Sequence, residues 1–188
     1  MGRWVHVMRL AVALLVLFAC TDAQAQYPWG YGQYGPPISP HASPYTGPLQ
    51  ALQSVAQPML DAHNAVRARL GLPPLVWSPE LARVAQDWAN NLISTRELRH
   101  QQNNRYGENL YAISGGTSSP AQVVKLWADE ARNYAAPTNS CARVCGHYTQ
   151  IVWRATRDVG CAEATDRYRQ VWVCEYDPPG NVVGYRPY

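Results

Sequence analysis

The sequence DVGCAEATDRYRQVWVCEY, at residues 158–176, contains the pattern that decides the fold class. Residues 158–164 and 169–176 each alternate in the manner of a β-strand with one buried face. Between them, residues 165–168 form the polar sequence TDRY, which suits a short connection. The stretch therefore predicts two antiparallel strands joined as a hairpin.

Helical patterns precede this hairpin. The expected helices are residues 58–70, 79–92 and 120–134, with a shorter one at 147–153. In the second and third, a serine is placed to cap the helix and a proline opens its first turn: Ser78 with Pro79, and Ser119 with Pro120. Apolar residues recur at helical spacing in each of the longer segments. Helices followed by an antiparallel strand pair indicate the α+β class rather than a wound parallel sheet.

The first residues have the form of a secretory signal. Arg3 and Arg9 precede an apolar run at 10–19 that is short for a membrane span. We expect a signal peptide over residues 1–25 and a protein that is secreted and extracellular. No transmembrane segment is expected.

Two cleavage sites compete within this signal. The sequence AQA at 23–25 suits ordinary signal peptidase, with cleavage before Gln26. The sequence LFAC at 17–20 resembles a bacterial lipobox, in which Cys20 would carry the lipid. We favour ordinary cleavage, and the alternative is a protein anchored to lipid through Cys20.

The remaining chain divides into a linker and one domain. Residues 26–57 are dominated by Pro, Gly, Tyr and Ser without a persistent apolar period, which is typical of a disordered linker. We expect the folded domain over residues 58–188, a length that suits one core. The formal net charge of +3 is small and evenly spread, so a nucleic-acid partner is not expected. We expect a monomer.

The expected export bears on the state of the cysteines. Removal of Cys20 with the signal leaves Cys141, Cys145, Cys161 and Cys174, and exported chains favour disulfides. Four cysteines allow three pairings: Cys141 and Cys145 are close enough to form a small loop, and Cys161 and Cys174 could join the strand pair. The alternative is a four-cysteine zinc site, against which the absence of a CxxC spacing speaks.

Four polar residues occur in or beside apolar segments, where a core would not place them: His100, Glu108, Glu130 and His147. A buried carboxylate requires a partner. Two histidines and two glutamates form either a hydrogen-bonded network or a metal site, and imidazole and carboxylate ligands suit zinc. The motifs HExxH, GxSxG and GxGxxG and the Walker loop are absent from the sequence, so standard enzyme signatures give no assignment.

Four ordered motifs resemble the CAP superfamily, which comprises cysteine-rich secretory proteins, antigen 5 and plant pathogenesis-related proteins of class 1. The motifs are GENLY at 107–111, LWADE at 126–130, GHYTQIVWRAT at 146–156 and VCEYDPPGN at 173–181. The resemblance extends over residues 58–188, and the tail PPGNVVGYRPY is especially similar to the plant proteins. It implies an α-β-α sandwich with a small antiparallel sheet between helical layers.

The resemblance also implies a central cleft lined by a His/Glu tetrad. Carried onto this sequence, the tetrad is the set of four residues already identified: His100, Glu108, Glu130 and His147. The family pattern favours the disulfides Cys141–Cys145 and Cys161–Cys174 and gives His63 a structural role. This chain departs from the pattern in three places: a longer loop at 101–106, Glu175 where an Asn or similar residue is usual, and the absence of two of the six plant cysteines.

Two functions remain as hypotheses. Because CAP relatives are associated with sterol and lipid binding, the first is a secreted, non-enzymatic module that binds a small apolar ligand or a cell-surface component. Its His/Glu cleft would bind a divalent metal, with zinc the expected ion. The alternative is a zinc-dependent, peptidase-like hydrolase in which one Glu activates a bound water. A purely structural extracellular module is a third reading. We favour binding because the tetrad offers no clear nucleophile.

Overall fold

The computed structural model describes residues 48–188, with side chains from residue 55 onward. The predicted signal peptide at 1–25, both cleavage sites with Cys20, and the first part of the predicted linker lie outside the described residues. Among the residues described, no helix combines the length and the apolar character needed to cross a bilayer.

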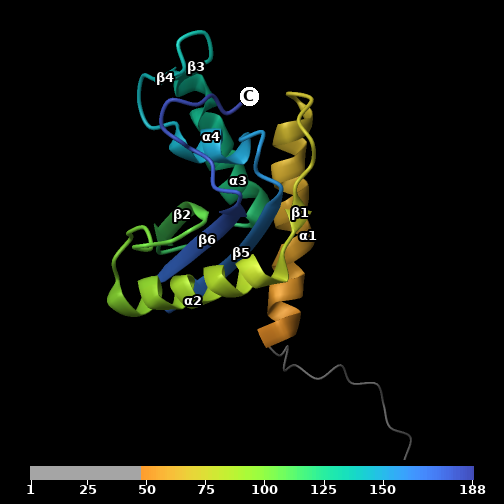
Figure 1. The fold of residues 1–188 in the computed structure, drawn as a ribbon. Coiled ribbons are helices and arrows are strands. Elements are labelled where there is room, and N and C mark those ends of the chain that lie inside the picture. Colours follow the sequence, from red (N-terminus) through yellow and green to blue (C-terminus); the bar gives the residue numbers. More distant parts are fainter. Residues whose placement is uncertain (1–47) are drawn as a thin grey trace, which may run out of the picture. The chain divides into compact units, whose positions relative to one another are not determined.

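A four-stranded sheet lies at the centre of the domain (Figure 1). In spatial order its strands are β1 (Val76–Trp77), β5 (Asp158–Thr165), β6 (Arg169–Asp177) and β2 (Gly107–Ser114). β5 and β6 are the predicted hairpin, and they pair antiparallel. β2 also pairs antiparallel with β6, whereas the two-residue β1 pairs parallel with β5. The predicted α+β class is confirmed, and β2 is a strand that the sequence pattern did not predict.

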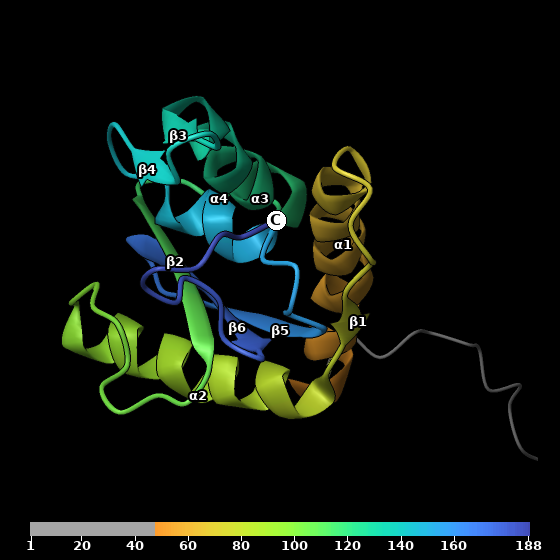
Figure 2. The ribbon, with the colours of Figure 1, turned by 45° about the horizontal axis from the view of Figure 1, so that its top comes forward.

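Helices cover both faces of this sheet (Figure 2). They are α1 (Pro48–Ala68), α2 (Pro79–Thr95), α3 (Pro120–Ala128) and α4 (Gly146–Ile151). α2 covers one face, and the other three lie on the opposite side. The arrangement is the α-β-α sandwich that the family resemblance implies.

α1 begins before the predicted domain start at residue 58. It starts at Pro48 and contains Pro58 within it. A proline inside a helix removes a backbone hydrogen bond. Val55 and the fully buried Met59 pack against the core on either side of Pro58, which offsets that loss. Residues 48–57 are therefore helical, and their assignment to a disordered linker is wrong.

The predicted helix at 120–134 is shorter than expected. Ser119 caps α3 in a reciprocal capping box with Gln122, as its position suggested. The helix ends at Ala128 and continues as the 3-10 turn η1 (Asp129–Asn133), followed by a small ribbon of β3 (Tyr134–Ala135) and β4 (Ser140–Cys141). This tighter turn sets the position of Glu130.

Side chains on β2 and β6 alternate between two cores. Leu110 and Val173 are opposite each other and pack in the core beneath α2. Glu108 and Glu175 are likewise opposite each other, two positions away along the same strands, so their side chains face the same side of the sheet. Asn109 faces the other side, toward α4.

The four cysteines form two disulfides, Cys141–Cys145 and Cys161–Cys174. The second joins opposite residues of β5 and β6 and is fully buried. Both pairings agree with the family pattern, and the four-cysteine zinc site is wrong.

Candidate functional site

The four tetrad residues form two separate His–Glu pairs. Nδ1 of His100 bonds the Glu108 carboxylate, and Nδ1 of His147 bonds Oε1 of Glu130 at 2.7 Å. Within residues 48–188, no three of the four bring ligand atoms to within 4.8 Å of one another. The structure therefore holds two histidine–carboxylate pairs rather than one assembled four-ligand cluster.

The His147–Glu130 pair lies where α4 begins. Glu130 Oε2 accepts hydrogen bonds from the backbone N–H of His147 at 3.0 Å and of Tyr148 at 3.4 Å. The first N–H groups of a helix lack intrahelical partners, so Glu130 satisfies them while it also holds the imidazole. The His147 ring stacks on Trp127 with 6.0 Å between ring centroids. Carboxylate and indole together fix the orientation of this ring.

The His100–Glu108 pair lies between the end of α2 and the start of β2. Glu108 Oε1 also accepts a hydrogen bond from the Gln101 backbone N–H at 3.2 Å. The side chain of Glu108 is 5% exposed, whereas that of His100 is 64% exposed. The hydrogen bond that His100 donates to Glu108 raises the pKa of His100 above its ordinary value.

A third carboxyl group adjoins this pair and was missed as a site residue. Glu175, opposite Glu108 in the sheet, is fully buried, and Asn104 donates a hydrogen bond to its Oε2 at 2.7 Å. Burial raises the pKa of Glu175 to about 8, the Asn104 hydrogen bond opposes that rise, and Glu108 adds to it. The sequence singled out Glu175 only as a departure from the family pattern, because nothing local shows which residue pairs with it.

A hydrogen bond joins β2, which carries Glu108, to α4, which carries His147. Asn109, next to Glu108, donates a hydrogen bond to the His147 carbonyl at 3.1 Å. A Cβ on Gly107 would lie 2.2 Å from Oε1 of Gln150, so a larger residue here would require the buried Gln150 side chain to move. The start of β2 is thus fixed against the helix that carries His147.

His63 belongs to the core behind the pairs. Its Nδ1 donates to the Met59 carbonyl at 2.8 Å, and its Nε2 accepts from the Tyr176 hydroxyl at 2.8 Å. Asn109 in turn donates to that hydroxyl at 3.1 Å. Both ring nitrogens are satisfied, in agreement with a structural role.

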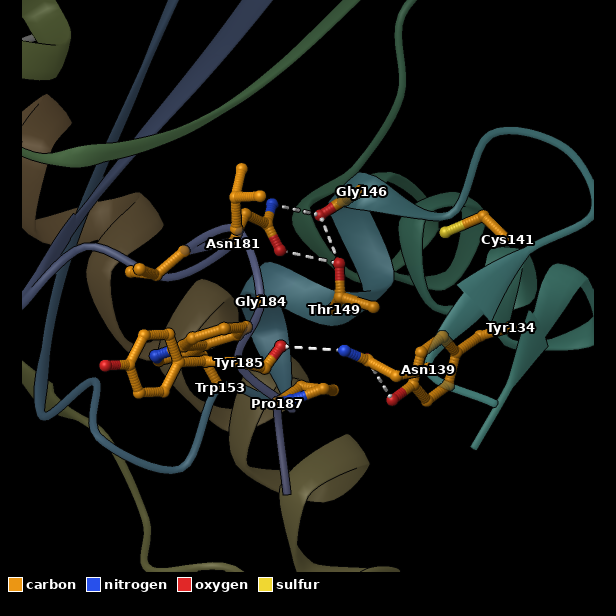
Figure 3. A pocket seen from close by; sticks show the side chains of 12 residues that line it. Tyr134, Asn139, Cys141, Gly146, Thr149, Trp153, Asn181, Gly184, Tyr185 and Pro187 are labelled. Atoms are coloured by element: carbon orange, nitrogen blue, oxygen red, sulfur yellow. Dashed lines mark hydrogen bonds between the residues drawn. The ribbon is translucent and has the colours of Figure 1, made fainter. Parts of the chain in front are cut away.

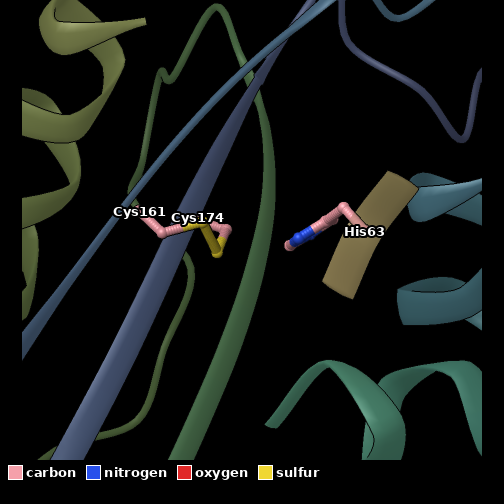
Figure 4. A group of neighbouring side chains, drawn as sticks. All are labelled: His63, Cys161 and Cys174. Carbon is pink, nitrogen blue, oxygen red and sulfur yellow. A yellow bond between two sulfur atoms is a disulfide. The ribbon is translucent and has the colours of Figure 1, made fainter. Parts of the chain in front are cut away.

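His63 also lies near the buried disulfide (Figure 4). One ligand atom each of His63, Cys161 and Cys174 lies within 4.8 Å of the others. Zinc binds cysteine as the thiolate, and both sulfur atoms here are bonded to each other. The group is therefore no metal site in the oxidised protein.

Two pockets lie near these elements. The first, of about 330 Å³, is formed by the start of α4, the β3–β4 region and the C-terminal segment (Figure 3). Asn181 anchors that segment by accepting from the Thr149 hydroxyl at 2.6 Å and donating to the Gly146 carbonyl at 2.9 Å. The second, also of about 330 Å³, is a groove between α1 and α3. Its small apolar lining residues are Ala62, Ala65, Val66, Ala121, Val124 and Ala128, joined by the charged Arg69, Lys125 and Asp129.

Comparison with known proteins assigns the family. Residues 60–176 match the family model CAP, described as the cysteine-rich secretory protein family. The chain therefore belongs to the CAP family, as its motifs suggested.

Plant proteins are among its relatives. Pathogenesis-related protein 1C of Nicotiana tabacum is 44% identical over 139 residues, which cover 72% of this chain and 82% of the relative. Pathogenesis-related protein 1 of Arabidopsis thaliana is 43% identical over 142 residues, covering 75% of this chain and 86% of the relative.

Solved structures share the fold. NaASP2, whose crystal structure was determined with Zn²⁺, superposes with a TM-score of 0.61 at 22% identity, covering 72% of this chain and 85% of that one. Venom allergen-like protein 4 of Schistosoma mansoni superposes with a TM-score of 0.56 at 25% identity, covering 69% and 90%. At this identity the NaASP2 likeness supports the fold alone.

Proposed function

We propose that this chain is an extracellular CAP module that binds ligands rather than converting them, and that its two histidines bind one divalent metal ion, with zinc the expected metal. One observation carries the metal assignment. Each imidazole directs Nδ1 to a carboxylate, while its Nε2 has no hydrogen-bond partner among the described residues.

This arrangement fixes which nitrogen can bind a metal. A carboxylate only accepts hydrogen bonds, so Nδ1 carries the proton and Nε2 of the neutral ring offers its lone pair. A carboxylate behind the imidazole is the usual support of metal-ligating histidines. His100 and His147 would therefore be the ligands, and Glu108 and Glu130 would orient them. A bound zinc would supply a positive charge for an anionic or carbonyl group of a ligand. The Zn²⁺ present with NaASP2 supports zinc as the first ion to test.

The same contacts favour binding over hydrolysis. A zinc hydrolase requires a carboxylate that can take a proton from the attacking water. Glu130 already accepts from the His147 ring and from two backbone N–H groups, and Glu108 accepts from His100 and Gln101. Both oxygens of Glu130 are thus engaged, and the Glu108 oxygen that accepts no bond is buried, so neither carboxylate presents a free oxygen to an attacking water.

Zinc binding should depend on both histidines. His147→Ala or His100→Ala removes one nitrogen ligand and should weaken zinc binding at least about tenfold, since even supporting residues behind a ligand contribute 10–100-fold. Titration calorimetry of each variant with zinc at neutral pH measures this. His63→Gln is the control, because both nitrogens of His63 are engaged in the core. Equal affinity of wild type and His147→Ala, or no binding by either, would refute the metal assignment.

A second observation favours an apolar ligand. The groove between α1 and α3 is lined mainly by alanine and valine, whose short side chains leave space between two helices. Burial of an acyl chain or sterol there would remove apolar surface from water, which stabilises a complex by about 25 cal/mol for each Å². We therefore propose this groove as the site of the small apolar ligand.

Filling the groove should abolish lipid binding. Ala65→Trp places an indole in the groove and should weaken binding of a fluorescent fatty acid or sterol at least about tenfold. Ala131→Trp is the matched control, because Ala131 is exposed on η1 and does not line the groove. Competition by unlabelled lipid in a fluorescence titration gives the affinities. If both variants bind as the wild type does, or if the wild type binds neither probe, the groove assignment fails.

A further inference from the structure

The two His–Glu pairs differ in what holds the carboxylate. Both oxygens of Glu130 accept hydrogen bonds, from the His147 ring and from the backbone at the start of α4. Glu108 uses only Oε1, which accepts from His100 and from the Gln101 backbone. Its Oε2 is buried and has no hydrogen-bond partner among the described residues. The carboxylate that holds His100 is therefore hydrogen-bonded at one oxygen, whereas the carboxylate that holds His147 is hydrogen-bonded at both.

Glu175 has the complementary deficit. Its Oε2 accepts a hydrogen bond from Asn104, and its Oε1 is buried without a partner among the described residues. Glu175 lies directly opposite Glu108 in the β2–β6 register, with both side chains on the same face of the sheet. Two unpaired buried oxygens in adjacent carboxyl groups would repel if both groups were charged, and each would lack the hydrogen bond that a buried polar atom requires.

One proton on Glu175 resolves both deficits. The neutral acid would donate its O–H from Oε1 to Oε2 of Glu108 and keep its own Oε2 as the acceptor for Asn104. Glu108 would then accept from Glu175 at Oε2 and from His100 at Oε1. The result is a continuous chain of hydrogen bonds from Asn104 through Glu175 and Glu108 to His100.

We propose that Glu175 is a positioning residue that, as a buried neutral acid, holds the Glu108 carboxylate in place for His100. The upward shift of the Glu175 pKa, caused mainly by burial, agrees with this assignment. The inference deepens the proposed metal site, because the ring that Glu108 orients is one of the two assigned ligands. It is tested without metal, so its outcome does not depend on whether zinc binds.

Two substitutions separate hydrogen bonding from packing. Glu175→Gln keeps a donor toward Glu108 and an acceptor toward Asn104 at the same length. Glu175→Leu keeps the volume and removes both. Nitrogen-15 NMR of the imidazoles in metal-free protein reports which ring nitrogen carries the proton. We expect His100 to be protonated at Nδ1 in the wild type and in Glu175→Gln, and to lose this preference in Glu175→Leu. His147, held by Glu130 alone, is the internal control and should be the same in all three.

The proposal is overturned if Glu175→Leu leaves His100 unchanged, or if Glu175→Gln disturbs it as much as Glu175→Leu does. A measurement on the wild type covers the case in which Glu175→Leu does not fold. At pH 6 the carboxyl carbon of Glu175 should show the carbon-13 shift of a neutral acid, and the shift of an ionised carboxylate would refute the proposal. In a zinc titration, Glu175→Leu should bind about 10–100-fold more weakly than Glu175→Gln. Equal binding would contradict the role of Glu175 in the metal site even if the tautomer result holds.

Discussion

Arg67→Met is expected to lower the free energy of unfolding by about 3–5 kcal/mol. Arg67 is fully buried and donates to backbone carbonyls: from Nε to Pro73 at 2.8 Å, from Nη1 to Ile151 and Trp153 at 2.8 Å each, and from Nη2 to Thr156 at 3.3 Å. The substitution leaves these acceptors buried without their donors, and methionine replaces only the apolar stem.

The expected loss of stability arises because Arg67 connects two parts of the domain. Arg67 lies near the end of α1, and its bonds join that helix to the segment that leads from α4 into β5. Urea unfolding of wild type and variant measures the difference. Arg69→Met is the control because Arg69 is exposed two residues away. A similar loss in both variants would show that the effect comes from the end of the helix rather than from the buried guanidinium.

The second large expected effect is a loss of folding stability in acid, caused by His63. Burial lowers the pKa of His63 from 6.5 to about 4; nearby Arg67 adds to this, and the Met59 carbonyl opposes it. Below pH 6.5 the unfolded chain binds a proton at this residue that the folded chain rejects, so stability falls as the pH drops toward 4. The loss over this window is about 3 kcal/mol.

Glu175 contributes with the opposite sign. Its folded pKa of about 8 lies above the ordinary 4.5, so its contribution to stability is lost as the pH rises from about 4.5 to 8. The two effects offset each other in the wild type and must be separated with a variant. The difference in unfolding free energy between wild type and His63→Gln should fall by about 3 kcal/mol from pH 7 to pH 4. A difference that does not change with pH would show that His63 is protonated equally in both states.

Local sequence patterns predicted the helices and strands that are determined by residues close to one another in the chain. The β5–β6 hairpin follows from alternation around a short polar connection, and Ser78 and Ser119 cap the helices that they precede. β2 could not be found in this way, because Gly107, Glu108 and Asn109 have conformations set by Gln150, His100 and α4, which are distant in sequence. The start of α1 was misplaced because composition indicated a linker up to residue 57, whereas α1 begins at Pro48 and Val55 packs against the core.

The sequence identified the four residues that form the two His–Glu pairs, but it did not show how they pair. His100, Glu108, Glu130 and His147 were identified by motif resemblance and by their placement beside apolar segments. Which Glu holds which His depends on the η1 turn and on the start of β2, and both are set by tertiary packing. Glu175 escaped notice as a site residue because its register opposite Glu108 is a property of the sheet.

The most direct test of the metal assignment is a zinc titration of the wild-type protein followed by nitrogen-15 NMR of its imidazoles. Before zinc is added, His100 and His147 should both be protonated at Nδ1 and unprotonated at Nε2. As zinc is added, the Nε2 signals of both rings should move together and stop at one equivalent, while His63 stays unchanged. Movement of only one of the two rings, movement of His63, or no movement at all would contradict the assignment.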